Sequence, residues 1–260
     1  MEPRAIAALE ETRQARGVAE TSPESIRVAG GWACWAEPGS WQNQAMGLGM
    51  DGPVRDASLD ELIAFYDAHG TPPQVEVSPH AHASLIGGLR DRGFALKAFE
   101  TVLYRALDAP VEGRWPEGIT VREVSKTDED DLRCYVETLT AGFAADAAET
   151  SDPGPALRAG LRVTKHPRVR SFLVEVDGEP AGAASLEIAE PLARLIGASV
   201  LPAFRRRGIQ TALVQLRARQ GWLAGCSHAT IQSRPGGGTE RNAVRLGFQV
   251  ACTKVTLDRR

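Results

Sequence analysis

The two halves of the chain end in the same pattern, which constrains the fold more than any other feature. Gly93-Phe94 opens an apolar, strand-like stretch that contains Leu103 and Arg105. Residues 247–259 repeat these four residues at the same spacing, and each stretch follows a helical pattern that ends at the glycine. Both halves also show the order strand, helix, strand, helix, strand. We therefore predict two copies of one fold.

A segment rich in proline and acidic residues separates the halves. We predict a first domain at residues 1–107, a linker at 108–117 and a second domain at 118–260. The alternation of strand and helix patterns predicts an α/β fold, or α+β by strict layer order. The Asp177-Gly178 pair is a strong signal for a hairpin between two antiparallel strands of the second domain.

Periodicity and turn residues define the expected elements. The expected helices cover residues 3–17, 59–66, 82–92, 128–143, 155–163, 208–223 and 240–246. The expected strands cover residues 25–36, 42–50, 74–77, 95–106, 119–124, 171–176, 181–189, 194–201, 228–233 and 248–257.

Composition excludes several classes of protein. A hydrophobic content of 43% is enough for a core, and a net charge of −3 is unlike that of a protein that coats nucleic acid. No apolar run is long enough to span a membrane, and the first residues lack the apolar core of a secretory signal. The cysteines are scattered, and His80 and His82 sit beside Pro79, so we expect no metal site. We expect a cytoplasmic protein without nucleic-acid or membrane partners, a monomer or homodimer.

Residues 198–213 carry a pattern with chemical meaning. An apolar strand ends at Pro202, a turn follows with Arg205, Arg206 and Arg207, and Gly208 opens a helix. The first amides of a helix have no partner within it and carry partial positive charge, so such a turn binds phosphate or pyrophosphate. Glycine lets the backbone approach the anion closely. The alternatives are a solvated basic helix start or a nucleic-acid patch.

This segment resembles the acyl-CoA-binding motif of the GNAT family of N-acetyltransferases. The family pattern is Arg or Gln, two residues, Gly, one residue, then Gly or Ala. The pattern begins here at Arg205 and ends at Gln210, which replaces the small residue. Residues 118–260 follow the order of the family, and the first half keeps its layout without an arginine-rich turn. The whole chain resembles tandem GNAT proteins in which only the second copy binds acyl-CoA. The resemblance implies two mixed, mostly antiparallel sheets flanked by helices.

The resemblance implies contacts for acetyl-CoA. The end of the strand would face the pantetheine arm and the thioester, and the turn would hold the pyrophosphate. Asn242 would face the cofactor, or it is a cap or a surface residue. The implied contacts are Ala198, Ser199, Val200, Arg205, Arg206, Arg207, Gly208, Ile209, Gln210, Thr211 and Asn242.

The implied reaction is direct attack of an amine on the thioester, which needs a general base or a water chain. Glu187 and Glu190 are the candidate bases, and each is also readable as an exposed strand glutamate. In many members of the family, a tyrosine that acts as general acid toward the leaving thiolate stands at the position that Ala243 occupies here. Cys252, Ser233 or a water substitutes for it, or the thiolate leaves unprotonated.

We therefore expect an acetyl-CoA-dependent N-acetyltransferase that acts on a primary amine of a small molecule. A protein or peptide N-acetyltransferase is one alternative, and a non-catalytic CoA-binding sensor or scaffold is another. The acceptor is not encoded in any motif, since loops such as residues 144–170 determine it.

Overall fold

The computed structural model describes residues 1–111, 113, 115–145 and 152–259. It consists of two compact units. Unit 1 comprises Met1–Leu103, Ser233–Glu240 and Val250–Arg260, and unit 2 comprises Tyr104–Gln232 and Arg241–Gln249. Residues 112 and 114 of the expected linker, and residues 146–151 of the expected acceptor loop, lie outside the described residues.

The units differ from the expected ranges 1–107 and 118–260, because unit 1 takes in two segments from the end of the chain. The reason is the last strand, β11 (Gln249–Arg259). It pairs antiparallel with β4 (Gln74–Val77), with Val255 opposite Val77. A division in sequence order cannot anticipate this pairing, since the two strands are far apart along the chain.

Besides β4 and β11, unit 1 contains the other helices and strands of the first half of the chain. They are α1 (Pro3–Thr21), β1 (Glu24–Val28), β2 (Gly31–Trp35), β3 (Gln44–Met46), α2 (Asp56–Ala68), α3 (Ala83–Asp91) and β5 (Phe94–Ala106), whose last residues belong to unit 2. The stretch 25–36, expected as one strand, is a hairpin. Ala29 and Gly30 form its turn with φ of 49° and 84°.

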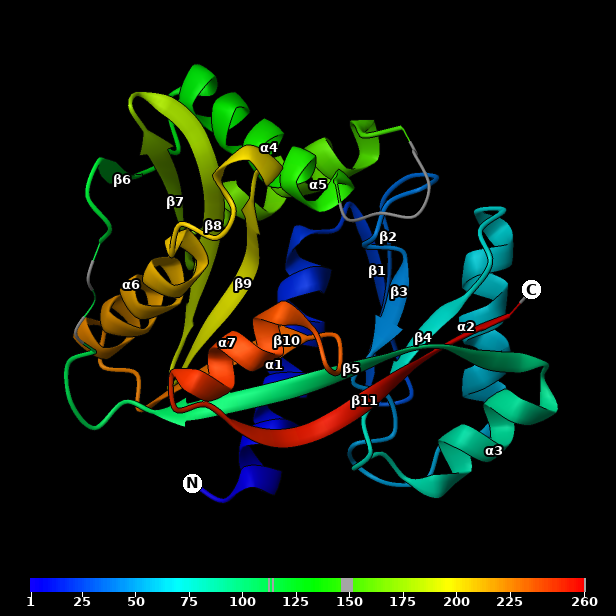
Figure 1. Ribbon diagram of the computed structural model, residues 1–260. Helices are drawn as coiled ribbons and strands as arrows, with labels where there is room; N and C mark the ends of the chain where they lie inside the picture. The colour runs from blue at the N-terminus through cyan, green and yellow to red at the C-terminus, as the bar shows by residue number, and fades with distance from the viewer. Residues whose placement is uncertain (112, 114, 146–151, 260) are drawn as a thin grey trace. The chain divides into compact units, whose positions relative to one another are not determined.

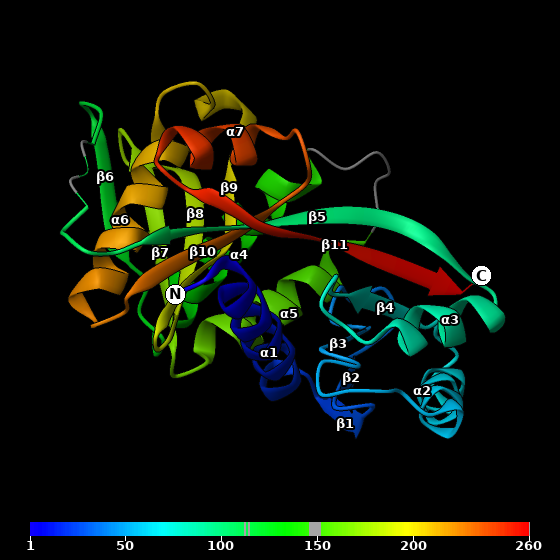
Figure 2. The same ribbon diagram turned by 90° about the horizontal axis from the view of Figure 1, so that it is seen from below.

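Helices cover both faces of the unit 1 sheet. Ala33 of β2 packs in a core cluster with Leu59 of α2, whereas the next residue, Cys34, packs with Ala15 of α1. Because successive residues of a strand point to opposite faces, α1 and α2 lie on opposite sides of this sheet, as Figure 2 shows.

Unit 2 holds the expected hairpin and the arginine-rich turn. Its elements are β6 (Ile119–Glu123), α4 (Glu129–Ala144), α5 (Gly154–Lys165), β7 (Val169–Val176), β8 (Glu179–Ala189), β9 (Leu192–Val200), the 3-10 turn η1 (Pro202–Phe204), α6 (Ile209–Leu223) and β10 (His228–Ser233). The helix α7 (Gly238–Arg245) is shared between the units. The carboxylate of Asp128 caps α4 by accepting hydrogen bonds from the amides of Asp130 and Asp131.

The unit 2 sheet is mixed and mostly antiparallel. Strands β6, β7, β8 and β9 pair antiparallel in chain order, and β10 pairs parallel with β9. Ala183 packs in a cluster with Leu132 of α4, and its neighbour Ala184 packs in another with Leu213 of α6. Helices α4 and α6 therefore cover opposite faces of this sheet (Figure 1). The expected α/β class is confirmed.

The two halves of the chain show the same succession of elements. From α1 onward the first half reads helix, three strands, helix, strand, helix, strand. From α5 onward the second half reads the same, with β11 as its last strand. In both units a parallel strand pair follows the antiparallel ones, β3 with β4 and β9 with β10.

A buried ion cluster ties β11 to unit 1. The ammonium of Lys254 lies 2.6 Å from a carboxylate oxygen of Glu76 on β4 and 3.1 Å from one of Glu11 on α1. All three side chains are almost fully buried. Burial alone would lower the pKa of Lys254, but the charges of Glu76 and Glu11 raise it above its usual value, so the lysine is charged at neutral pH. Burial raises the pKa of Glu11.

Replacing Lys254 with Met should destabilise the protein by about 3–5 kcal/mol at neutral pH, because two buried carboxylates lose their cation. The pKa of Glu11 then rises further, since Lys254 normally lowers it. A carboxyl with a raised folded-state pKa binds more protons when folded, so stability falls as pH rises above its unfolded pKa. The free energy of unfolding of the variant should therefore fall more steeply between about pH 5 and pH 8 than in the wild type.

Chemical denaturation across this pH range measures the effect. The matched control is Lys97→Met in the same unit, because Lys97 is half exposed and lies 3.6 Å from Asp258. It should change stability by no more than about 1 kcal/mol. Equal losses of stability in the two variants would contradict a specific stabilising role for Lys254.

Candidate functional site

The arginine-rich turn of unit 2 forms an open helix start. Gly208 is the N-cap of α6 with φ of 82°, and no side chain caps the helix. Arg206 also has a positive φ, 62°. The first amides of α6, beginning at Ile209, have no acceptor within the helix and point away from its axis. Such a start, after residues of alternating backbone handedness, forms a concave site for an anion.

The arginines of the turn contact the protein itself. Arg205 donates from Nε to the carbonyl of Val200 at 3.0 Å and from Nη2 to the carbonyl of Gly142 at 3.3 Å. It thereby ties the turn to the end of β9 and to the last turn of α4. The guanidinium of Arg207 lies over the ring of Phe204, 5.5 Å from its centre. These contacts hold the turn in shape and leave positive charge beside the helix start.

Asn242 of α7 joins the first turn of α6. Its Oδ1 accepts a hydrogen bond from the hydroxyl of Thr211 at 3.0 Å, and its Nδ2 donates to the side chain of Gln210 at 3.4 Å. Asn242 is buried. It is therefore neither an exposed residue nor a helix cap, and the side chain of Gln210 is directed toward Asn242 by this contact.

The strands next to the turn separate before they end. Pairing of β9 with β10 runs from Leu192–His228 to Leu195–Ile231, although β9 continues to Val200. The amide of Leu201 donates to the carbonyl of Ala181 on β8 at 2.9 Å. Because peptide groups alternate in direction along a strand, those of Ala198 and Val200 face the opposite edge, where the pairing with β10 has stopped.

Helix α4 packs closely against this part of β9. The hydroxyl of Ser199 donates to the carbonyl of Leu139 at 3.0 Å. A Cβ atom at Gly142 would lie only 2.3 Å from that hydroxyl oxygen, so glycine is required for this approach. Ser199 is therefore held by α4 through its side chain, and its peptide groups face β8, so the structure does not present this expected contact to a ligand.

The structure brings together most of the expected contacts. Residues 198–200 and 205–211 lie on one continuous path from the end of β9 to the first turn of α6, and Asn242 joins them. Unexpected members of this region are Leu139 and Gly142, whose carbonyls receive hydrogen bonds from it. A glycine at position 142, inside a predicted helix, was the one sequence signal that this helix packs closely against another element.

The candidate bases lie elsewhere. Glu187 pairs with Arg194 near the β8–β9 hairpin, four residues along β9 from Ala198, or roughly 13 Å at the rise of a strand. Glu190 is exposed in the turn of that hairpin. The structure therefore does not bring either carboxylate to the end of β9.

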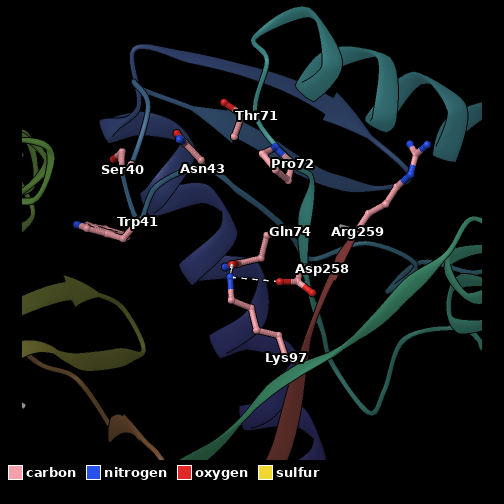
Figure 3. A pocket seen from close by; sticks show the side chains of 10 residues that line it. Ser40, Trp41, Asn43, Thr71, Pro72, Gln74, Lys97, Asp258 and Arg259 are labelled. Carbon is pink, nitrogen blue, oxygen red and sulfur yellow. Dashed lines mark hydrogen bonds and ion pairs between the residues drawn. The ribbon is translucent and has the colours of Figure 1, made fainter. Parts of the chain in front are cut away.

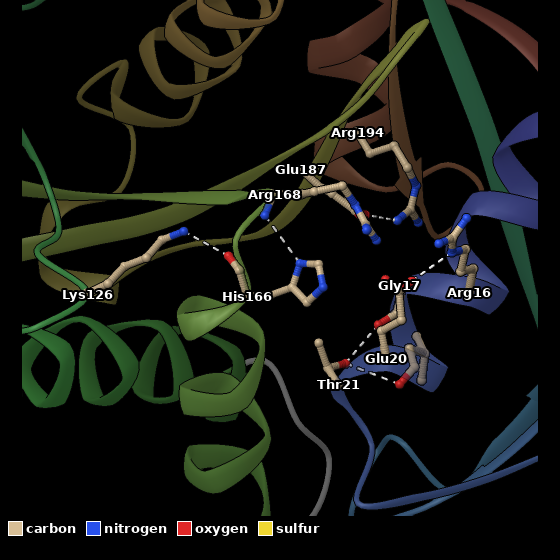
Figure 4. A network of polar contacts seen from close by, with 10 residues as sticks. Arg16, Gly17, Glu20, Thr21, Lys126, His166, Arg168, Glu187 and Arg194 are labelled. Atoms are coloured by element: carbon tan, nitrogen blue, oxygen red, sulfur yellow. Dashed lines mark hydrogen bonds and ion pairs between the residues drawn. The ribbon is translucent and has the colours of Figure 1, made fainter.

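Glu187 is bound by two arginines, of which Figure 4 shows the contact with Arg194. Arg168 lies 3.1 Å from Oε1, and Arg194 lies 2.5 Å from Oε2. The glutamate is 3% exposed. Both oxygens thus already accept charged hydrogen bonds, an arrangement that favours a structural role and leaves the base role a hypothesis.

The expected general acid is absent. Ala243, at the position where relatives place tyrosine, is fully buried in unit 2. The suggested substitutes Ser233 and Cys252 belong to unit 1. Burial raises the pKa of the Cys252 thiol to about 11, which weakens it as an acid. The hydroxyl of Ser233 donates to the carbonyl of Arg234 at 3.1 Å.

A separate hollow of about 430 Å³ lies within unit 1 and is drawn in Figure 3. Trp41 and Lys97 are among the side chains that line it. Lys97 donates to Gln74 at 2.6 Å and lies 3.6 Å from Asp258, so its charge is engaged within the protein. We assign no role to this hollow.

Neither a metal cluster nor a membrane-spanning helix occurs in the described ranges. In them no three His, Cys, Asp or Glu side chains gather in a way that could hold a metal ion. The ring of His82 accepts a hydrogen bond from the amide of Ser84 and so caps α3. None of the described helices has the length and apolar character needed to cross a bilayer.

Comparison with known families identifies the segment that contains the turn. Residues 130–248 match the acetyltransferase (GNAT) family. This is less than half of the chain, and it assigns a GNAT acetyltransferase domain to that segment. Acetyltransferases of this family are acyl-CoA-dependent transferases. No curated protein matches the chain in sequence.

Solved structures share the fold at low identity. A GCN5-related N-acetyltransferase from Kribbella flavida has a TM-score of 0.72 and 20% identity, covering 98% of this chain and 95% of its own. A tandem GNAT protein from the clavulanic acid biosynthesis pathway has a TM-score of 0.57 and 13% identity, covering 78% of this chain and 68% of its own. A GCN5-related N-acetyltransferase from Sphaerobacter thermophilus has a TM-score of 0.57 and 20% identity, covering 73% and 59%.

Replacing Gly208 with Glu should raise the dissociation constant for acetyl-CoA by about a hundredfold or more. A carboxylate at the helix start repels a pyrophosphate, and a side chain at φ of 82° displaces the amides. The matched control is Gly225→Glu beyond the other end of α6, where φ is 85° and a Cβ atom would have no other atom within 4 Å. Calorimetric titration measures both. Similar losses in affinity would contradict the anion site.

Replacing Glu187 with Gln tests its role. We expect a loss of about 1.5–3 kcal/mol in stability, because two charged hydrogen bonds weaken, and an unchanged pH dependence of turnover. Glu190→Gln, at an exposed position, should change stability by no more than about 0.5 kcal/mol. If Glu187→Gln instead keeps its stability and loses the ionisation in the pH profile, Glu187 is the base.

Proposed function

We propose that this protein transfers an acetyl group from acetyl-CoA to a primary amine of a small molecule. The observation that carries the proposal is the continuous backbone path from the end of β9 that does not pair with β10, at Ala198, to the start of α6 without a side-chain cap, at Ile209. One end of this path suits a thioester and the other suits a pyrophosphate, and the GNAT match covers both.

In the proposed complex the backbone amides of residues 206–211 bind the pyrophosphate. The positive end of the α6 dipole and the neighbouring arginines favour its charge. The peptide groups of Ala198 and Val200 lie beside the pantetheine arm and the acetyl carbonyl. The thioester carbonyl is a hydrogen-bond acceptor, so the N–H groups of these residues are the ones that polarise it, while the carbonyl of Val200 accepts from Arg205.

The proposed reaction forms a C–N bond and breaks the C–S bond of the thioester. The amine lone pair attacks the acetyl carbon, and the electron pair of the C–S bond leaves with the CoA thiolate. Since Glu187 is paired with arginines, we propose that water removes the amine proton. Because a thiol is a far stronger acid than an alcohol, the thiolate leaves without the tyrosine that Ala243 replaces.

We further propose that unit 1 is a degenerate copy of the same fold without an acyl-CoA site. The matching order of elements supports this. In its corresponding turn, the amide of Gly47 donates to Glu11, that of Gly49 to the carbonyl of Ala29, and that of Val54 to the hydroxyl of Ser84. Asp56 opens α2. These amides are engaged, and an acidic residue would repel phosphate.

A non-catalytic CoA-binding protein is the second candidate. Two observations favour it, namely the alanine at position 243 and the arginine pairs of Glu187. Such a protein would bind acetyl-CoA and release no free thiol with any amine. Turnover therefore separates the two candidates, and binding alone does not.

The first test is thermal unfolding with acetyl-CoA, desulfo-CoA and ATP. A ligand that binds only the folded state adds about 2.7 kcal/mol at a hundredfold excess over its dissociation constant. We expect both CoA compounds to raise the midpoint and ATP to leave it nearly unchanged. No shift with either CoA compound would overturn the proposal.

The second test measures release of the CoA thiol with a panel of small primary amines and a panel of peptides. Product formation with a small amine, confirmed by mass spectrometry, supports the proposed acceptor class. Activity with peptides alone would favour a peptide N-acetyltransferase. Binding without turnover across both panels would establish the non-catalytic candidate.

A further inference from the structure

An arginine is completely buried beneath β9. Arg217 of α6 has 0% exposure and is the largest fully buried side chain of the described residues. Its Nη1 donates to the carbonyls of Ser185 at 3.0 Å and Ile196 at 3.2 Å, and its Nε donates to the carbonyl of Leu213 at 3.0 Å. The guanidinium thus reaches from the helix to two neighbouring strands.

This placement is costly. Burial lowers the pKa of Arg217 to about 10, so the side chain is still charged at neutral pH. No carboxylate of the described residues forms an ion pair with it, and its Nη2 has no hydrogen-bond acceptor among them. An apolar residue would fill the position at lower desolvation cost. Packing of α6 against the sheet therefore does not explain the arginine.

The two strand carbonyls that Arg217 contacts belong to a β-bulge. Ser185 pairs with Ile196, but the preceding residue Ala184 pairs with Ala198, so Gly197 is the extra residue. Its φ of 42° lies in the left-handed region, which glycine adopts readily. A bulge interrupts the regular ladder of hydrogen bonds, and Arg217 supplies donors to carbonyls at the interruption.

The same bulge is held from the other face of the sheet. The hydroxyl of Ser185 lies 2.6 Å from that of Tyr135 on α4 and 2.8 Å from that of Ser171 on β7. All these side chains are buried. Ser185 is therefore held by its side chain on the α4 face and by its carbonyl on the α6 face.

The direction of the next peptide groups depends on the bulge. One extra residue reverses which peptide groups of the following segment face each edge of the strand. After Gly197, the groups of Ala198 and Val200 face the edge where β10 has separated. Without the extra residue, Ser199 would present its peptide group there instead.

We propose that Arg217 is a positioning residue for acyl transfer. By holding the bulge at Gly197, it aims the amides of Ala198 and Val200 at the thioester carbonyl. It contacts neither the substrate nor the reacting atoms. This inference rests on the proposed acetyl transfer at the end of β9.

The main test uses the full chain and carbonyl-labelled acetyl-CoA, and its infrared readout needs no knowledge of the acceptor. Isotope-edited infrared spectroscopy measures the stretching frequency of the bound thioester carbonyl, which falls when hydrogen-bond donors polarise it. The variants are Arg217→Met, which removes the donors, and Arg217→Lys, which keeps the charge. The matched control is Arg219→Met, because Arg219 is an exposed arginine of the same helix.

We expect a lowered frequency in the wild type and in Arg219→Met. In Arg217→Met the shift should shrink by at least half, and in Arg217→Lys by less. Affinity for desulfo-CoA should stay within about twofold, because the α6 start is untouched, while kcat with an active amine falls about tenfold or more. A purely structural role would change stability without moving the carbonyl frequency.

A full wild-type shift in Arg217→Met, or no shift in the wild type despite bound acetyl-CoA, would overturn the inference. If Arg217→Met does not fold, Arg217→Lys carries the test, and a wild-type frequency in that variant is then the contrary result. Failure of the wild type to bind acetyl-CoA would instead overturn the proposed function.

Discussion

The early separation of β9 from β10 is the constraint on which the site depends. A strand inside a sheet uses its backbone groups on both edges, so it has none to offer a ligand. Here the parallel pairing with β10 stops at Leu195, and among the described residues the rest of β9 pairs with β8 alone. The bulge at Gly197 then determines which of the peptide groups face the open edge.

The turn after β9 likewise leaves backbone groups exposed, here at the start of a helix. Gly208 starts α6 without a side-chain cap, and Arg205 braces the turn against β9 and α4. In unit 1 the corresponding turn contains Gly47, Gly49 and Gly52, but the amides of Gly47 and Gly49 donate to protein oxygens. The same arrangement of elements therefore yields a helix start without a side-chain cap in one unit and a turn with engaged amides in the other.

Most elements of unit 2 were predictable because their signals are local. The Asp177-Gly178 pair forms the expected hairpin turn, with φ of 53° and 83°. The strand at residues 228–233 has the expected bounds, and α6 begins one residue later than expected. The stretch 25–36 was misread because its residues suit a strand throughout. Ala29 and Gly30, which turn it into a hairpin, were a weaker signal than the run of apolar residues around them.

The sequence by itself determined the helices, most of the strands and the glycine that opens α6, since these follow from local periodicity and from turn residues. Tertiary structure alone decided that β11 joins unit 1, that Glu187 is held by Arg168 and Arg194, and that Arg217 is buried under the bulge. Each of these features depends on contacts between residues that lie on different elements of the structure. Strand register and packing determine which residues meet, and neither can be derived from a local sequence pattern.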